Sequence, residues 1–221
     1  SMSALRKFAM AAAVSGAAAL TMAGGALAST VHVSSNNVVG TTNNITMTNV
    51  PDLGEVKGRA GAFHMTGVDT GDTPDSLVGS FVAFCIDLAT TLSVPSTYQV
   101  SNSPVSAAVQ SLFDANYSAD LANDADKAAA FQVALWQTLY GEFDVSGLND
   151  TAMGLVTAYL GEANGYDQGR KWNLTMLVDG NPTTQDVIAV APVPLPAAGF
   201  LLFGGLAGLG IAARRRKNAQ A

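Results

Sequence analysis

Cysteine and histidine are nearly absent from this sequence. Its 221 residues include one cysteine, Cys85, and two histidines, His32 and His64. A single cysteine has no partner within the chain, so no internal disulfide holds the fold. Between its two ends the sequence also lacks an internal repeat of about 20 to 50 residues and any block of like charges, which argues against a repeat array.

Basic residues are also scarce between the two ends of the chain. Six of the eleven Lys and Arg residues are terminal: Arg6, Lys7, Arg214, Arg215, Arg216 and Lys217. The part between them carries five basic residues against seventeen acids, which gives a formal charge of −12. Such an acidic domain argues against DNA, RNA or anionic lipid as its partners.

The N-terminus has the pattern of an export signal. Arg6 and Lys7 precede an Ala-rich apolar run over residues 8–23, and Ala26-Leu27-Ala28 has the small-x-small pattern of a cleavage site. We therefore expect residues 1–28 to be a signal peptide and the secreted part to begin at Ser29.

The C-terminus has the pattern of a membrane anchor. The uncharged run from Ala197 to Ala213 is at the short limit of what spans the hydrocarbon core of a bilayer. The basic cluster that follows should hold its end on the cytoplasmic side, and an apolar run of this length makes a nucleic-acid patch the weaker explanation of the cluster. An ordinary single-pass anchor that is never processed stays open as an alternative.

The order of the C-terminal parts resembles the PEP-CTERM class of bacterial sorting signals, in its VPLPA-CTERM variant. The matching residues are Val193, Pro194, Leu195, Pro196 and Ala197, then the Gly-rich hydrophobic helix, then Arg214, Arg215 and Arg216. The resemblance implies that a membrane transpeptidase of the exosortase type cuts near the Pro-rich motif. Residues 192–221 would then anchor the protein in the inner membrane of a Gram-negative bacterium before its transfer to the cell surface or extracellular matrix.

Residues 29–191 remain as one secreted domain with a real core. Patterns typical of strands cover residues 30–39, 43–50, 59–68, 78–89, 171–178 and 185–191. Helical patterns cover residues 103–113, with Ser103 as N-cap, 124–139, ending at Gly141, and 151–162. We expect an α+β fold, a mostly antiparallel β-sheet or barrel with a helical insertion of about three helices. Residues 54–75 are a weaker candidate for a mobile loop.

Cys85 lies in the most strand-like segment of the chain. Both faces of residues 78–89 are largely apolar, which is typical of a buried strand and places the thiol inside the protein. A lone cysteine in an exported protein has three explanations: a small buried hydrophobe, an intermolecular disulfide, or a dedicated reactive thiol. On position alone, the buried hydrophobe is the simplest.

Gln132 is a polar residue in the middle of an apolar helix face. Ala128 and Ala129 come one turn before it, and Leu135 and Trp136 one turn after it. A buried amide without hydrogen-bond partners costs about 1 to 3 kcal/mol, so a helix that only packs a core would use Leu or Met here. Covalent capture of the amide by a thiol would remove this cost.

The segments around these two residues resemble the paired motifs of the thioester domains on Gram-positive surface adhesins. The matching segments are Phe84-Cys85-Ile86-Asp87 and Ala130-Phe131-Gln132-Val133-Ala134-Leu135-Trp136. In that family a Cys in a C-[IV]-D strand condenses with a Gln in a TQxA-[IL]-W helix. The resemblance implies that Cys85 supplies the sulfur and Gln132 the acyl group, with Asp87 and Trp136 as accompanying motif residues and without a cofactor. Phe131 stands where the family has Thr.

The resemblance leads to a mechanistic expectation. The Cys85 thiolate attacks the side-chain carbonyl of Gln132, ammonia leaves, and the thioester is stored in a dry pocket. The expected walls of this pocket are Phe81, Phe84, Phe131 and Trp136. Because burial raises the pKa of a thiol, a nearby group has to activate it, and Asp87 is the nearest candidate. An amine of a surface or matrix ligand would then react once per molecule, which is covalent adhesion and not enzymatic catalysis.

Two other functions compete with this expectation. A Cys/His hydrolase would use Cys85 with His32 or His64, but no catalytic signature surrounds either histidine. A passive protein of the cell surface or biofilm matrix would make only ordinary, non-covalent contacts. It shares its predicted location with the covalent adhesin.

Metal binding is the remaining possibility considered, and we expect no metal. Two clusters could supply oxygen ligands: Asp69, Asp72 and Asp75, and Asn123, Asp124 and Asp126. Neither cluster has the spacing of an EF-hand loop. A solvated acidic turn and the acidic N-terminus of a helix account for them.

Overall fold

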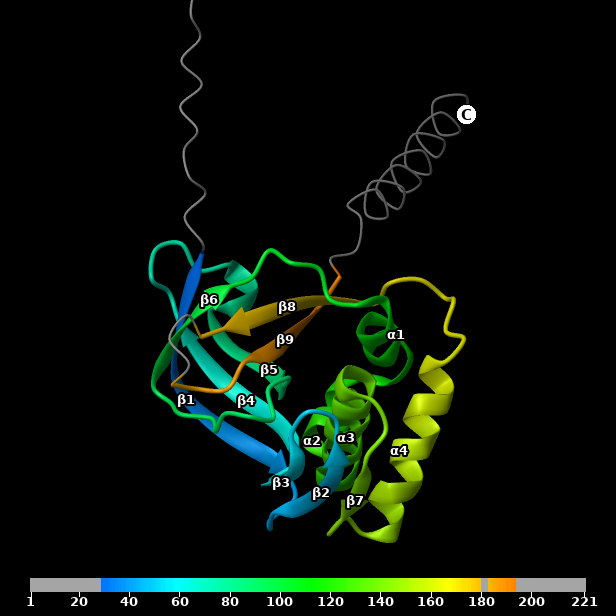
Figure 1. Ribbon diagram of the computed structural model, residues 1–221. Coiled ribbons are helices and arrows are strands. Elements are labelled where there is room, and N and C mark those ends of the chain that lie inside the picture. The colour runs from blue at the N-terminus through cyan, green and yellow to red at the C-terminus, as the bar shows by residue number, and fades with distance from the viewer. Residues whose placement is uncertain (1–28, 180–182, 194–221) are drawn as a thin grey trace, which may run out of the picture.

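A closed β-barrel and a layer of helices beside it make up the described part of the computed structural model, residues 29–179 and 183–193 (Figure 1). The barrel strands are β1 (Thr30–Gly40), β4 (Gly61–Val68), β5 (Gly79–Cys85), β6 (Ser96–Val100), β8 (Trp172–Val178) and β9 (Val187–Pro192). They follow the order β1-β4-β5-β9-β8-β6, and every neighbouring pair is antiparallel. The predicted α+β class with an antiparallel barrel is confirmed.

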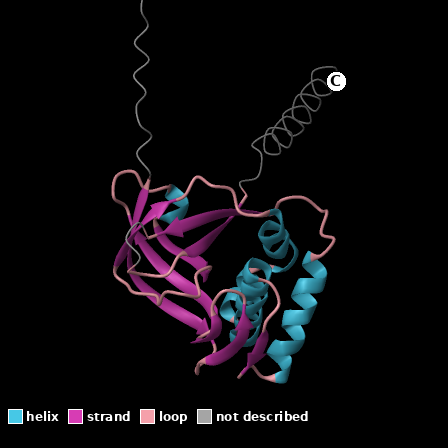
Figure 2. Ribbon diagram, viewed as in Figure 1, coloured by secondary structure: helices cyan, strands magenta, loops and turns pink. Residues whose placement is uncertain are grey.

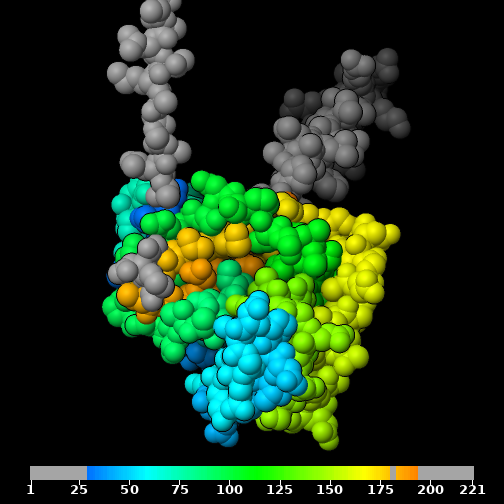
Figure 3. Space-filling model, in the orientation of Figure 1, coloured from blue at the N-terminus to red at the C-terminus, as the bar shows by residue number. Residues whose placement is uncertain are grey.

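A small second sheet connects the barrel end to the helical layer. Its strands are β2 (Ile45–Val50), β3 (Gly54–Gly58) and β7 (Asp144–Ser146), in the order β3-β2-β7. Asn49, at an irregularity near the end of β2, and Asp52, in the turn to β3, have φ values of 60° and 64°, a left-handed conformation that Asn and Asp tolerate better than most residues. In Figure 3 the cyan surface of this hairpin lies beside the yellow-green surface of the helices.

The helices form the insertion between β6 and β8 and lie together on one side of the barrel (Figure 2). They are α1 (Ala107–Asn116), α2 (Ala119–Asn123), α3 (Ala125–Tyr140) and α4 (Asp150–Ala163), and a short 3-10 turn, η1 (Asp75–Leu77), precedes β5. Helix α3 is central, because it contacts α1, α2 and α4 as well as β1 and β4.

Helix α3 begins and ends where its sequence predicts. The carboxylate of Asp124 accepts a hydrogen bond from Lys127 N at 3.0 Å and caps the first turn. Gly141 follows the last residue with φ 92°, a conformation that favours glycine. Between Ala128 and Trp136 every side chain is buried, so α3 is a core helix.

Alternate residues of β5 face the helices and the barrel interior. The ring of Phe84 lies 4.8 Å from that of Phe131 and 5.7 Å from that of Phe113, measured between centroids, so Phe84 faces the helical layer. Successive side chains of a strand point to opposite faces. Cys85 therefore points into the barrel, where it is 1% exposed.

The helical insertion differs from the prediction at two points. It contains four α-helices and not three, because the five-residue α2 carries too few residues for a periodic pattern. Helix α1 is capped by Ser106 and not by Ser103: the Ser106 hydroxyl accepts a hydrogen bond from Val109 N at 3.3 Å. Two serines three residues apart both fit the capping rule, and the second one starts the helix.

The strands also differ from the prediction in places. Strand β5 ends at Cys85 and does not continue to Ala89, since the next residues bind a helix side chain. The segment expected as a mobile loop, residues 54–75, contains β3 and β4, and its loop is confined to the residues after Val68. Strands β6 and β7 were not predicted, because both are short and β6 is largely polar.

The expected terminal signals lie almost wholly outside the described residues. The signal peptide at 1–28 and the anchor with its basic cluster fall there, and of the VPLPA motif only Val193 is described. Val193 N donates to Lys171 O at 3.2 Å, which continues the pairing of β9 with β8 by one residue. Within residues 29–179 and 183–193, no helix has the length and apolar character needed to cross a membrane.

Candidate functional site

The structure brings Cys85 and Gln132 into direct contact, although 47 residues separate them in the sequence. Cys85 is the last residue of β5, and Gln132 lies in the middle of α3. Cys85 N donates to Gln132 Oε1 at 2.8 Å, and Gln132 Nε2 donates to Cys85 O at 2.8 Å. Both residues are 1% exposed.

The register of the barrel explains why a side-chain amide fits beside Cys85. On one side, β5 pairs with β9 as far as Cys85 opposite Val187. On the other side, its pairing with β4 stops two residues earlier, at Phe63 opposite Ala83. A carboxamide offers one acceptor and a donor, like a peptide group, so Gln132 satisfies the backbone groups that β4 leaves unpaired.

This pairing corrects one step of the sequence argument. We expected the buried amide of Gln132 to be costly unless it found hydrogen-bond partners or was captured covalently by a thiol. Its carbonyl oxygen and its amide nitrogen both have a hydrogen-bond partner in the uncondensed state. Burial of Gln132 is therefore accounted for without a covalent bond, because the backbone of Cys85 matches its donor and acceptor.

The thiol of Cys85 is held in its protonated form. Its Sγ donates to Asp87 O at 3.0 Å. Burial raises the pKa of Cys85 to about 12, and the charges of Asp87 and Asp186 add to the rise, while the hydrogen bond to Asp87 and the Trp136 indole offset part of it. A buried thiol in this setting needs a change of environment, or a base, before it can act as a nucleophile.

Asp87 contributes its backbone and not its carboxylate to the thiol. The carbonyl oxygen accepts hydrogen bonds from Cys85 Sγ and from Gln185 Nε2, the latter at 3.1 Å. The carboxylate accepts from Ala89 N at 2.8 Å, a local turn bond. Our expectation that the Asp87 carboxylate activates the thiol is not supported by this geometry, because its charge raises the pKa of Cys85.

Trp136 lies one helical turn after Gln132 and is 2% exposed. Its Nε1 has no hydrogen-bond partner among the described residues. A buried N–H without a partner costs free energy, so a native structure that keeps one has a reason for it. The indole lies close enough to Cys85 to lower the pKa of the thiol, an effect that adds to the larger one of the hydrogen bond to Asp87 O.

The expected walls of the thiol pocket divide between the two faces of β5. Phe84 and Phe131 belong to an aromatic cluster with Phe113 and Tyr117 on the helix side. Phe81 lies on the same face of β5 as Cys85. Phe84 and Phe131, two of the four expected wall residues, therefore lie on the face of β5 that is opposite to Cys85. Phe131, which stands where the thioester-domain motif has Thr, packs in the aromatic cluster.

Two residues near Cys85 escaped the sequence analysis. Tyr140 Oη donates to Ile86 O at 3.1 Å and accepts from Leu88 N at 3.2 Å, so it holds the segment after Cys85. Gln185 Nε2 reaches Thr90 O at 2.9 Å in addition to Asp87 O. Tyr140 comes one turn after Trp136 on the same helix, and this spacing could have indicated that it lies near Cys85. No local sequence pattern indicated the position of Gln185.

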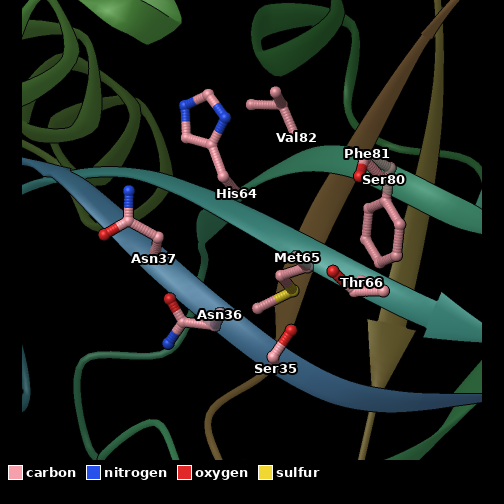
Figure 4. A pocket seen from close by; sticks show the side chains of 9 residues that line it. All are labelled: Ser35, Asn36, Asn37, His64, Met65, Thr66, Ser80, Phe81 and Val82. Atoms are coloured by element: carbon pink, nitrogen blue, oxygen red, sulfur yellow. The ribbon is translucent and has the colours of Figure 1, made fainter.

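The two histidines lie apart from the thiol. His32 Nδ1 is 3.0 Å from Thr97 Oγ1, and His64 Nε2 is 2.9 Å from Ala122 O. Figure 4 shows the His64 ring beside Val82, its partner in the pairing of β4 with β5, and both residues line a pocket of about 330 Å³. Cys85 faces the opposite side, so the structure does not assemble a Cys/His pair from these residues.

The acidic clusters are engaged in local hydrogen bonds. Asp72 Oδ1 accepts from the hydroxyls of Thr70 and Thr30, which lowers the pKa of Asp72 below its ordinary value. Asp69 accepts from Gly71 N, and Asp124 caps α3. Within the described residues, no three His, Cys, Asp or Glu side chains are grouped closely enough to hold a metal ion.

Comparison with known proteins gave one structural likeness. No protein-family model matches the sequence, and a search of curated proteins also found no match. The chain is similar to a solved structure, the N-terminal domain of the Streptococcus pyogenes pilus tip adhesin Cpa, with a TM-score of 0.40 and 12% sequence identity. The likeness covers 76% of this chain and 95% of that chain. This likeness carries no functional assignment, which therefore depends on the residues of the chain itself.

Proposed function

We propose that this chain is an exported bacterial surface protein whose domain forms a thioester between Cys85 and Gln132 and uses it to attach covalently to a partner. The observation that carries the proposal is the contact between these two residues. The only cysteine of the chain and a buried glutamine meet from different elements, at the end of a barrel strand and the centre of a core helix. Holding two reacting groups together removes much of the entropic cost of their reaction.

The hydrogen bonds at the site suit the condensation. Cys85 N donates to Gln132 Oε1 at 2.8 Å, which polarises the carbonyl that the sulfur must attack. The same N–H stabilises the negative charge that develops on this oxygen during the addition. Because both residues are 1% exposed, water has little access to the thioester once it has formed.

The reaction balances without a cofactor. Cys85 Sγ bonds to Gln132 Cδ, the bond between Cδ and Nε2 breaks, and the thiol proton leaves with the amide nitrogen as ammonia. With a pKa of about 12, the thiolate fraction at neutral pH is small, on the order of one part in a hundred thousand. Formation is therefore a slow, single event that follows folding, and not catalytic turnover.

Intact mass tests the proposal. The purified protein should be lighter than its sequence mass by one ammonia, and Cys85→Ala and Gln132→Ala should each restore the uncondensed mass. Gln137→Ala is the matched control, because Gln137 lies on the same helix and bonds to Phe143 O instead. A full mass together with a thiol that can be titrated after denaturation would sink the thioester.

Delivery to the surface forms the second half of the proposal. Residues 1–28 act as the signal peptide, and the segment from Val193 to Lys217 acts as a VPLPA-CTERM sorting signal for an exosortase-type transpeptidase. Replacing Arg214, Arg215 and Arg216 by Gln should leave export intact but reduce retention in the inner membrane. Cell fractionation with an antibody to the domain measures this, and unchanged fractions would count against the sorting signal.

A non-covalent structural protein of the surface or matrix is the second candidate. The observation in its favour is that the carbonyl oxygen and the amide nitrogen of Gln132 each have a partner on the backbone of Cys85 in the uncondensed state. The two functions differ in the stability of their complexes with partner material. Complexes that survive boiling in denaturant, and are lost with Cys85→Ala, support covalent attachment; complexes that dissociate support the structural protein.

A further inference from the structure

A pocket of about 570 Å³ lies beside the segment that follows Cys85 in the chain, because residues 88–92 belong to its lining. We call it the mouth pocket and define it by six of its lining residues: Trp136, Phe63, Gln185, Asn36, Lys57 and Arg59. Trp136 and Phe63 are buried and form its floor, whereas Lys57 and Arg59 are exposed and form its rim. The volume is in the range of small-molecule sites.

One lining residue of the mouth pocket shares a hydrogen-bond acceptor with the thiol. Gln185 Nε2 and Cys85 Sγ donate to the same acceptor, Asp87 O, at 3.1 and 3.0 Å. Trp136 comes one helical turn after Gln132 and acts on the Cys85 thiol from the other side. Gln185 and Trp136 are therefore the two lining residues that connect the mouth pocket with the thiol.

Two polar atoms of the lining have no hydrogen-bond partner. Trp136 Nε1 is an unpaired donor on a side chain that is 2% exposed, and Asn36 Oδ1 is an unpaired buried acceptor. Buried polar atoms are nearly always paired, with protein, with water or with a ligand. A ligand that offers N–H groups would satisfy Asn36, while the Trp136 N–H lies near enough to the Cys85 sulfur to favour its thiolate.

The charge of the lining is opposite to that of the domain. The described residues contain five Lys and Arg residues, of which Lys57 and Arg59 line this pocket, while none of the seventeen Asp and Glu residues does. The charge of Lys57 is partly offset by Glu55, whose Oε1 lies 3.0 Å from Lys57 Nζ in an ion pair of two exposed side chains. Arg59 donates Nε to Thr41 O at 2.8 Å, and no carboxylate of the described chain forms an ion pair with it.

We propose, building on the proposed thioester, that the mouth pocket binds the attacking nucleophile and selects primary amines that carry an anionic group. The amine lies at the floor beside Asn36, and the anionic group lies at the rim beside Arg59. Deeper in, the carboxylates of Asp87 and Asp186 place negative charge near Cys85 and attract the ammonium form of the amine. The ammonium gives one proton to solvent, and the neutral amine that results is the nucleophile. The pocket thus binds a zwitterionic molecule, with its ammonium group at the floor and its anionic group at the rim.

The reaction in the pocket balances as an acyl transfer. The amine nitrogen bonds to Gln132 Cδ, the bond between Cδ and Cys85 Sγ breaks, and the proton lost by the amine ends on the sulfur. The products are an amide on Gln132 and a free Cys85 thiol. The unpaired Trp136 N–H stabilises the sulfur as it leaves, since it favours the thiolate.

Three small amines of similar size test the selectivity on the purified protein. Taurine is anionic, methoxyethylamine is neutral, and aminoethyl-trimethylammonium is cationic. Each rate of mass gain is divided by the rate of the same amine with a free small-molecule thioester, which removes differences in intrinsic reactivity. We expect taurine to react roughly fivefold faster than methoxyethylamine, and the cationic amine to react more slowly than either.

Three variants test whether Arg59, at the rim of the mouth pocket, causes the preference for taurine. Arg59→Gln should remove most of the taurine preference, and Arg59→Lys, which keeps the charge, should retain it. Lys127→Gln removes the same charge from an exposed pair with Asp124, outside the pocket lining, and should leave the preference unchanged. Circular dichroism melting curves identify any variant that is not folded, and the comparison of the three amines on the unmodified protein does not depend on a variant.

The outcomes separate this inference from the proposed function. A protein without the loss of ammonia overturns the thioester and the selectivity together. A protein that has lost ammonia but reacts equally with all three amines, or prefers the cationic one, overturns the selectivity alone. A taurine preference that Arg59→Gln leaves intact also overturns it, because the anion would then be recognised elsewhere.

Discussion

Gln132 stands next to Cys85 in the place where β4 would have continued its pairing with β5. Its carboxamide makes the two hydrogen bonds that a strand neighbour would make, each 2.8 Å long. One side chain therefore completes the barrel and also positions a carbonyl beside the only thiol. The two roles can be separated, because the first needs only the backbone of Cys85 and the second needs its sulfur.

Comparing Cys85→Ala with Gln132→Ala separates these roles. Neither variant can form a thioester, so any contribution of the cross-link is missing from both. Gln132→Ala also leaves the buried N–H and C=O of Cys85 unpaired, so its free energy of unfolding should be lower by about 1 to 3 kcal/mol than that of Cys85→Ala. Urea denaturation measures the difference, and equal values would mean that the pairing with Gln132 contributes little.

Opening the thioester should make stability depend on alkaline pH. Aminolysis by methylamine frees the Cys85 thiol, whose pKa is raised from 9.0 to about 12 by burial. The folded state then holds its proton more tightly than the unfolded state, so this contribution is complete below pH 9 and is lost as the pH rises toward 12. Between pH 9 and 11 the opened protein should lose about 2 kcal/mol relative to Cys85→Ala, measured by denaturation at each pH.

The unopened protein is the control for that experiment. It has no Cys85 thiol to titrate, so the difference between it and Cys85→Ala should stay constant over the same pH range. A parallel decline in the opened and unopened proteins would assign the pH dependence to other groups, such as the buried tyrosines.

Tyr140→Phe should destabilise the segment after Cys85. The hydroxyl bridges Ile86 O and Leu88 N, so its removal leaves a carbonyl and an amide without their partner and should cost about 1 to 2 kcal/mol. Tyr117→Phe is the matched control, because it removes a buried hydroxyl that makes no bridging hydrogen bond. Burial alone raises the pKa of the Tyr117 hydroxyl, and no hydrogen bond contributes. If both variants melt at the same temperature, the bridge does not hold the segment.

Asp114 should be the most sensitive carboxylate of the domain. It is 3% exposed, and its oxygens accept from Lys171 N, Trp172 N and Gln110 Nε2, which ties α1 to the start of β8. Asp114→Ala should lower the free energy of unfolding by about 2 to 4 kcal/mol. Asp120→Ala, at an exposed position in α2, should change it by less than about 0.5 kcal/mol, and similar losses in the two variants would contradict the role of Asp114.

Local patterns in the sequence predicted the elements that carry the site. Helix α3 has a capping Asp124, an apolar run and a terminal Gly141, and β5 is apolar on both faces, so both were recognisable without the structure. The contact of Cys85 with Gln132 was expected from motif resemblance alone. Its hydrogen bonds were not, because they depend on where the pairing of β4 with β5 stops.

Other parts of the site could not be read from local sequence. Gln185 comes from a loop 98 residues after Asp87, and its bond to Asp87 O exists because β9 pairs with β5 in one register. The mouth pocket joins Asn36, Arg59 and Trp136, which lie in three distant segments. Barrel closure brings them together, and no periodicity in the chain encodes that closure.

Strand β9 gives the domain a defined path for mechanical force. It is the last strand of the barrel, it pairs with β5 up to Val187 opposite Cys85, and it ends one residue before Val193. A pull on the chain beyond Val193 therefore runs lengthwise along β9 and loads its ladders with β5 and β8 in shear, so that many hydrogen bonds resist at once. A partner joined at Gln132 would pull from the other side of β5, and the barrel would carry tension across the strand that ends in Cys85.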